Sequence, residues 1–346
     1  MNKLLIIGNG FDLAHGLETS YNHFLLWYYK QLWVEYRDTK KLENQFYKFD
    51  GNPNFMALLP IEKIEDFSEF LKLNSLENAC KSELLREVEK MYYDRRWVNI
   101  EWVYYQILLK YAKKLHQDGP MARNGVINNV TKLNNDLQYL ALNLAKYLKT
   151  ESERKVEKKN DLAYHLHTIA GNNQGDSVMC INFNYTSTIF TYAQELNITA
   201  MNNEYVVNIH GNLEDETNPI IFGYGDEMDL AYQQLENLNE NIFLDQVKSF
   251  WYSKTENYRK VMRFCDSEDF RVYILGHSCG LSDRVLLNQL FEHDKCDHIQ
   301  IFYHQKKDGS NDFFEKTQEI SRHFKLENKA QMRQKIVSFE KSKPLS

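Results

Sequence analysis

Short apolar runs recur along the chain, separated by longer stretches in which apolar positions return every three or four residues. Unbroken apolar runs are typical of strands that are covered on both faces, as in parallel sheets. Most of the runs end in glycine, asparagine or histidine, and most precede a helical pattern. This alternation predicts an α/β fold with a Rossmann-like, mostly parallel sheet. The runs are residues 4–7, 178–183, 205–209, 220–222, 272–275 and 299–303.

A large α-helical insertion is expected after the first strand, because roughly 170 residues between the first two runs show helical periodicity and little else. One helical face is predicted by spacings of four and three at Trp97, Glu101, Tyr104, Leu108, Tyr111 and Leu115, and a second by Leu133, Leu137, Leu140, Leu144 and Tyr147. The predicted division is a Rossmann-like nucleotide-binding core at 1–19 and 172–325, an inserted helical domain at 20–171, and a polar C-terminal tail at 326–346.

Composition narrows the class of protein further. Only 14 glycines and 5 prolines occur in 346 residues, so the chain has few tight turns and its glycines should lie where the backbone requires them. The net charge of −6 argues against nucleic acid as the main partner. Five scattered cysteines suit a reducing cytoplasm and give no metal-ligand spacing. No segment approaches the roughly 18 apolar residues that span a membrane, so we expect a cytoplasmic protein.

The first motif that can carry chemistry follows the first apolar run and reads Gly8-Asn9-Gly10-Phe11-Asp12. A strand that ends in two spaced glycines and enters a turn is how nucleotide-binding sheets bring backbone amides close to phosphate. A plain tight turn explains the same residues equally well. Asp12 can stabilise a developing positive charge, but a carboxylate repels a pyrophosphate placed beside it.

Two further motifs place polar side chains at predicted strand ends, where parallel sheets bind ligands. Asn184 can orient a water molecule or a ribose hydroxyl, and His210 can act as a general base near neutral pH. Both side chains can instead satisfy backbone groups at a strand-to-helix turn.

The late motif Gly276-His277-Ser278-Cys279-Gly280, followed by Asp283, allows two interpretations. Taken literally it is the G-x-S-x-G nucleophile elbow of α/β-hydrolases, with Ser278 as the nucleophile. A hydrolase would also need a later acid and histidine, for which only one further strand is evident. The second interpretation is nucleotide binding, in which Gly276 permits close approach and Ser278 bonds to a ribose or phosphate.

Glu101 lies in the middle of an apolar helical stripe. A buried carboxylate needs a partner or a raised pKa. Arg95, Arg96 or a lysine elsewhere in the chain is the expected partner.

In their order along the chain, the motifs resemble the bacteriophage abortive-infection AbiH family. The block GNGFDLAHGLETSY at 8–21 is similar to the opening signature of that family. Blocks at 183–186, 209–211, 222–226 and 276–283 follow in the family's order, so the resemblance covers nearly the whole chain and constrains the helical insertion least.

AbiH proteins are in turn similar to the sirtuin-type NAD-binding fold. In that group a glycine loop binds the dinucleotide phosphates, which implies a cofactor-binding role for the residues 8–12 named above. A late block contacts the adenosine side, which implies binding by Gly276, His277, Ser278 and Asp283.

The same resemblance implies catalytic roles for Asn184, near the nicotinamide ribose, and for His210, as the base. The zinc-binding cysteines of sirtuins are missing, which argues against protein deacetylation and is compatible with cleavage of NAD. No metal is expected.

The leading hypothesis is an antiphage effector that binds NAD or a related nucleotide and hydrolyses its N-glycosidic bond, acting as an NADase. The expected partners are the nucleotide, a phage-derived trigger and further copies of the chain in a homo-oligomer, with no membrane and no nucleic acid. One alternative is a serine hydrolase that uses Ser278. Another is a non-catalytic, nucleotide-sensing interaction module that contacts a partner through the helical insertion.

Overall fold

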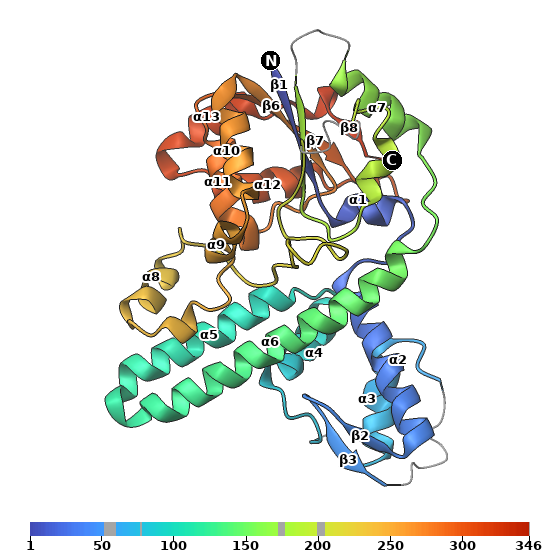
Figure 1. Ribbon diagram of the computed structural model, residues 1–346, viewed down its shortest axis with the longest axis vertical. Coiled ribbons are helices and arrows are strands. Elements are labelled where there is room, and N and C mark those ends of the chain that lie inside the picture. The colour runs from blue at the N-terminus through green and yellow to red at the C-terminus, as the bar shows by residue number, and fades with distance from the viewer. Residues whose placement is uncertain (52–59, 77, 172–176, 199–204, 346) are drawn as a thin grey trace.

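One parallel sheet organises the upper half of the molecule in the computed structural model, which describes residues 1–51, 60–76, 78–171, 177–198 and 205–345 (Figure 1). Within these residues the strand order is β5-β4-β1-β6-β7-β8, and every neighbouring pair is parallel. The α/β fold with a Rossmann-like parallel sheet is therefore confirmed. The strands are β1 (Asn2–Ile7), β4 (Val178–Asn182), β5 (Val206–Asn208), β6 (Phe270–Leu275), β7 (Cys296–Tyr303) and β8 (Lys343–Pro344).

Helices cover both faces of the sheet, which explains why its strands are unbroken apolar runs. Side chains alternate along β1, so that Leu4 and Ile6 enter one buried cluster while Leu5 and Ile7 enter another. The first cluster includes apolar side chains of α10 (Asn257–Ser267), α11 (Arg284–Phe291) and α12 (Phe313–His323). The second includes side chains of α1 (Asn9–Ala14) and α7 (Asn160–Ala170).

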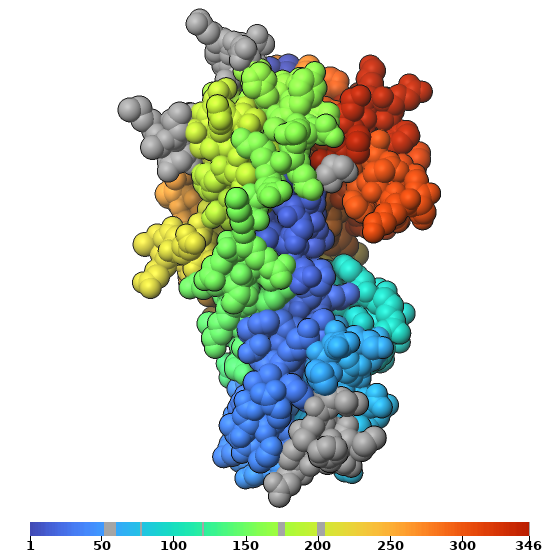
Figure 2. All heavy atoms as spheres, turned by 90° about the vertical axis from the view of Figure 1, so that its right-hand side faces the viewer, coloured from blue at the N-terminus to red at the C-terminus, as the bar shows by residue number. Residues whose placement is uncertain are grey.

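The helical insertion extends from the carboxyl edge of the sheet and forms the lower half of the molecule (Figures 1 and 2). Its first helix begins after Ser20, whose side chain accepts a hydrogen bond from the backbone N–H of His23. The insertion has its own large apolar core, rich in tyrosine and phenylalanine. Its elements are α2 (Tyr21–Thr39), the antiparallel strands β2 (Lys41–Glu43) and β3 (Lys48–Asp50), α3 (Ile64–Leu73), α4 (Glu83–Arg95), α5 (Ile100–Asp118) and α6 (Arg123–Ser152).

The division between sheet unit and insertion differs from the expected one in three places. Helix α7 was expected in the insertion, but its Leu162 and Leu166 pack on the sheet. Residues 222–247, which include α8 (Leu230–Asn237), were expected in the core, but Phe222, Tyr224 and Phe243 join the apolar core of the insertion. The expected boundary at residue 172 itself is not counted among these differences, because residues 172–176 lie outside the described residues.

The third difference concerns the C-terminal residues, which were expected to form a polar tail. Helix α13 (Lys329–Lys335) and strand β8 pack along β7, and Met332 and Leu345 are buried. The apolar side chains in this polar segment are thus sufficient to attach it to the sheet. Residues 220–222, expected to be a strand, have no regular secondary structure.

Candidate functional site

The motif residues gather at the carboxyl edge of the sheet, where the strand order reverses. From β1 the chain fills one side with β4 and β5, and then crosses to the other side with β6 and β7. This reversal is the topological switch point at which open α/β sheets bind their ligands. The insertion lies against the same edge (Figure 1).

Two glycine-containing loops pack directly on each other at the switch point. The backbone N–H of Gly8 donates to the carbonyl of Leu275 (3.1 Å), and that of Gly10 donates to the carbonyl of Gly276 (2.8 Å). A Cβ atom at Gly8 would lie 2.4 Å from Cα of His277, and one at Gly276 would lie 2.1 Å from the backbone nitrogen of Phe11. These glycines therefore allow two protein loops to touch. Phosphate binding by the first loop stays a prediction, and it would require the two N–H groups to exchange partners.

Asp12 is buried in α1 behind this loop and connects that helix to the segment after β4. Its Oδ2 accepts a hydrogen bond from Thr186 Oγ1 (2.6 Å), whereas Oδ1 has no hydrogen-bond partner among the described residues. Asn184 lies beside it and donates from Nδ2 to the carbonyl of Gly8 (3.0 Å). Burial raises the pKa of Asp12 to about 6, despite the hydrogen bond from Thr186.

The other residues of the first motif have separate environments. Asn9 is exposed and accepts a hydrogen bond from Thr19. The ring of Phe11 is buried, with its centroid 5.8 Å from that of Tyr192. Phe11 thus anchors the loop in the apolar core and does not face the polar edge.

The raised pKa of Asp12 gives a testable dependence of stability on pH. Its value of about 6 in the folded protein exceeds the unfolded value of 3.8. The folded state therefore binds this proton more tightly, and the wild-type protein loses stability as the pH rises from about 4 to 7. We expect Asp12→Asn, which cannot ionise, to become more stable than wild type over this range, by up to about 3 kcal/mol. Urea denaturation at several pH values measures the difference.

Asp308→Asn, on an exposed loop, is the control for the Asp12 experiment and should not show that increase with pH. A constant difference between Asp12→Asn and wild type from pH 4 to 7 would contradict the raised pKa.

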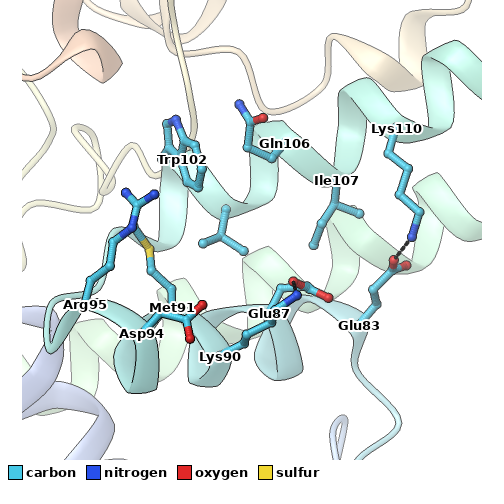
Figure 3. Close-up of a pocket in the computed structure, with 11 residues that line it drawn as sticks. Glu83, Glu87, Lys90, Met91, Asp94, Arg95, Trp102, Gln106, Ile107 and Lys110 are labelled. Carbon is cyan, nitrogen blue, oxygen red and sulfur yellow. Dashed lines mark hydrogen bonds and ion pairs between the residues drawn. The ribbon is translucent and has the colours of Figure 1, made fainter.

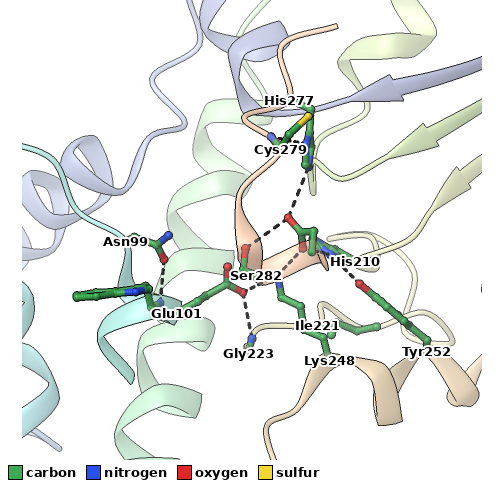
Figure 4. A network of polar contacts seen from close by, with 12 residues as sticks. Asn99, Glu101, His210, Ile221, Gly223, Lys248, Tyr252, His277, Cys279 and Ser282 are labelled. Atoms are coloured by element: carbon green, nitrogen blue, oxygen red, sulfur yellow. Dashed lines mark hydrogen bonds and ion pairs between the residues drawn. The ribbon is translucent and has the colours of Figure 1, made fainter. Parts of the chain in front are cut away.

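A buried charged network also lies at this edge of the sheet (Figure 4). Nε2 of His210 is 3.1 Å from Oδ1 of Asp283, and Nζ of Lys248 is 2.9 Å from the same oxygen. Lys248 also lies 3.0 Å from Oε1 of Glu101, which accepts a hydrogen bond from the N–H of Gly223 (3.1 Å). These side chains come from both halves of the molecule, so the network joins the insertion to the sheet.

The local chain explains how Glu101 reaches the sheet edge. Asn99 caps α5 and accepts a hydrogen bond from the N–H of Trp102 (2.9 Å), which places Glu101 in the first turn of the helix. A carboxylate is stabilised at a helix N-terminus. Arg95 instead lies over the ring of Trp102, and Arg96 pairs with Glu65. Of the expected partners for Glu101, the lysine elsewhere in the chain is therefore the one observed.

The pKa shifts in the network follow from burial and from Lys248. Burial opposes ionisation of Asp283, but Lys248 and His210 hold the pKa of this carboxyl well below its usual value. Burial raises the pKa of Glu101 more than Lys248 lowers it. Burial and then Lys248 lower the pKa of His210 to about 4, so its imidazole is neutral at pH 7. A neutral imidazole is the form that can accept a proton.

The late motif contributes His277 and Asp283 to this network but not Ser278. Nε2 of His277 faces Oδ2 of Asp283 at 3.5 Å. Ser278 is exposed, and no described histidine is hydrogen-bonded to its hydroxyl. Cys279 has a positive φ of 55° but is buried, and burial raises the pKa of its thiol to about 12. The described residues therefore do not assemble a serine nucleophile with a base.

Lys248 was not anticipated from the sequence. It lies outside every motif, in α9 (Lys248–Trp251), and its side chain is 2% exposed. The only signal that pointed to it was indirect, because Glu101 within an apolar stripe requires a cation.

A surface pocket of about 360 Å³ lies elsewhere, between α4 and α5 (Figure 3). Trp102 and Met91 contribute apolar surface, and Lys110 on its wall pairs with Glu83 at 2.7 Å. The residues that line this pocket include no member of the buried network.

Among the described helices none is long and apolar enough to cross a membrane. The described histidine, cysteine and acidic side chains form no metal-binding group of three or more.

Comparison with known proteins identifies the family. No curated protein gives a significant match to the chain. The family described as bacteriophage abortive infection AbiH matches residues 4–305, which supports a role in antiphage abortive infection. The chain therefore belongs to the AbiH family.

Proposed function

We propose that the carboxyl edge of the sheet binds NAD or a related nucleotide and hydrolyses its N-glycosidic bond, so that the protein stops the metabolism of an infected cell. The observation that carries this proposal is the position of Asn184 and His210 beside the switch point of a sheet with Rossmann strand order. The lowered pKa of His210, which favours an uncharged imidazole, agrees with it. Family membership supports the defence role, and the chemistry is our inference.

The proposed reaction needs few groups on the protein. The bond between C1′ of the ribose and the nicotinamide nitrogen breaks, and its electron pair leaves with neutral nicotinamide. Water adds to the oxocarbenium-like carbon and releases one proton. In this proposal Asn184 holds the ribose, and His210 accepts the proton from water. The products are nicotinamide and ADP-ribose.

The polar side chains at this edge fit the ribose better than the pyrophosphate. Asn184, His210 and the Asp12 oxygen that has no partner among the described residues can bond to hydroxyl groups. The amides of Gly8 and Gly10 already donate to protein carbonyls. We therefore infer that the pyrophosphate lies away from the first loop, or that this loop separates from Gly276 on binding.

Access also requires movement, because His210 and Asn184 are both less than a tenth exposed. The hydroxyl of Tyr185 donates to the carbonyl of Ile221 (3.0 Å), and its ring centroid is 6.5 Å from that of His210. In this proposal the protein exchanges between a closed conformation, with His210 and Asn184 buried, and an open one that admits the nucleotide. A phage-derived trigger that binds the open conformation more tightly would increase its population and therefore the turnover.

The test is mass spectrometry of NAD and related nucleotides incubated with the purified protein, with and without lysate of phage-infected cells. We expect loss of the nucleotide and release of nicotinamide. His210→Ala and Asn184→Ala should each slow the reaction roughly 100-fold, because each removes a group that acts on the ribose or water. His304→Ala, which removes an exposed histidine, is the matched control and should retain the wild-type rate.

Other outcomes distinguish the alternatives. Tight binding of a nucleotide without turnover would support the sensing module. Labelling by a fluorophosphonate probe that is lost in Ser278→Ala would support the serine hydrolase. Intact nucleotides under every condition would refute the proposal.

A further inference from the structure

Lys248 occupies the centre of the buried network, between carboxyl groups supplied by the two halves of the molecule (Figure 4). Glu101 comes from the insertion, and Asp283 follows β6. All three side chains are at most a tenth exposed. Burying these charges costs free energy that their mutual attraction must offset. Lys248 has no step in the proposed reaction.

Lys248 and His210 share one acceptor atom. Both Nζ of Lys248 (2.9 Å) and Nε2 of His210 (3.1 Å) contact Oδ1 of Asp283. A protonated His210 would place two cations on one oxygen in a site with little water. Like charges that both contact one atom repel each other strongly. The fixed cation of Lys248 therefore favours the uncharged imidazole of His210.

The hydrogen bonds around Asp283 also select the tautomer of His210. Nδ1 of His277 accepts from the N–H of Cys279 (3.0 Å), so Nε2 of His277 carries its hydrogen toward Oδ2 of Asp283. Asp283 is ionised and can only accept. The neutral His210 therefore donates from Nε2 to Asp283, and its Nδ1 is the nitrogen that can accept a proton.

We propose that Lys248 is a positioning residue for His210, which keeps the imidazole uncharged and leaves Nδ1 as the proton acceptor of the site. The use of that nitrogen in turnover rests on the proposed function. The lowered pKa of His210, caused by burial and then by Lys248, agrees with this arrangement.

The remaining titratable groups around His210 do not replace Lys248. The hydroxyl of Tyr252 is 3.4 Å from Nε2, and the ring centroid of Tyr185 is 6.5 Å from that of the imidazole. Burial raises the pKa of Tyr252, Tyr185 and Tyr21 well above 10, so these phenols are neutral at physiological pH. His277 faces Asp283, and Glu101 lies beyond Lys248. Lys248 is thus the fixed positive charge of the described network.

NMR of protein labelled at the histidine side chains tests the proposal directly. The signal that disappears in His210→Gln assigns His210. In Lys248→Met we expect its titration to move upward by roughly 1–3 pH units relative to wild type. Lys248→Arg, which keeps the cation, should restore most of the shift. Lys254→Met, which removes an exposed lysine that lies over Trp251, should leave the titration unchanged.

A second variant can be measured if Lys248→Met does not fold. Lys248→Met combined with Glu101→Gln removes both members of the outer ion pair and should also raise the titration of His210, by less. An unchanged titration of His210 in either folded variant would overturn the proposal.

The NMR measurement needs no substrate, so absence of nucleotide hydrolysis by the wild-type protein would refute the proposed function alone. Where hydrolysis is observed, the acid limb of its pH profile should move upward in Lys248→Met and return in Lys248→Arg.

Discussion

Lys248→Met is expected to lower the free energy of unfolding by about 3–5 kcal/mol, because removal of one partner leaves buried charge without compensation. Lys248 is 2% exposed and contacts both Glu101 and Asp283 within 3.0 Å. Without it two carboxyl groups remain in the same buried space, and each must lose its charge or draw in water. Urea denaturation at pH 7.5 and fixed ionic strength measures the change.

A lysine–glutamate pair with an exposed lysine, at the surface of the same protein, provides the control. Lys110 is 68% exposed and lies 2.7 Å from Glu83. Lys110→Met should change the free energy of unfolding by no more than about 1 kcal/mol, as is usual for surface pairs. Addition of Glu101→Gln to Lys248→Met should recover part of the loss, since it removes one of the unpaired carboxyl groups. If Lys248→Met costs no more than Lys110→Met, the buried network contributes little to stability.

Much of the fold could be predicted because its signals are local. The apolar run at 4–7 is unbroken because β1 is covered on both faces. The face from Leu133 to Tyr147 lies in α6 and is buried as expected. Local patterns do not show which core a segment joins. Leu162 of α7 and Phe222 are apolar residues in either arrangement, and only the tertiary structure assigns them to the sheet and the insertion respectively.

Some residues of the candidate site could be predicted from the sequence and others could not. Asn184, His210 and His277 could be predicted to follow strands at the carboxyl edge of the sheet, since parallel strands bring these ends to one edge. Lys248 could not be predicted, because nothing in its neighbourhood distinguishes a buried lysine from an exposed one. The glycines were predicted to lie at strand ends, but their contacts could not be. Gly8 and Gly276 touch the backbone of a loop that is distant in sequence.

Those contacts make Gly276→Ala the second variant with a large expected effect, a loss of about 4 kcal/mol in the free energy of unfolding. Gly276 has a φ of +75°, where an L-residue costs roughly 1–2 kcal/mol. Its added Cβ would also lie 2.1 Å from the backbone nitrogen of Phe11. Overpacking of this kind costs about 1–3 kcal/mol, and a backbone atom cannot move aside as the end of a flexible side chain can.

Two other glycines separate the strain of the backbone from the overlap of atoms. Gly16 has a φ of +79°, but a Cβ there meets no atom of the described residues within 4 Å, so Gly16→Ala should cost only about 1–2 kcal/mol. Gly125 lies within α6 with equally open space, and Gly125→Ala should stabilise the protein by about 0.5–1 kcal/mol. The same urea denaturation measures all three variants.

The series also decides between two uses of Gly276. If the glycine serves the contact between the two loops, Gly276→Ala loses much more stability than Gly16→Ala. If it serves close approach of a nucleotide to loops that are usually apart, Gly276→Ala should match Gly16→Ala in stability and lose nucleotide binding instead. The hydrogen bond from Gly10 to the carbonyl of Gly276 favours the first result, because the closed loops satisfy an amide that would otherwise need a ligand or water.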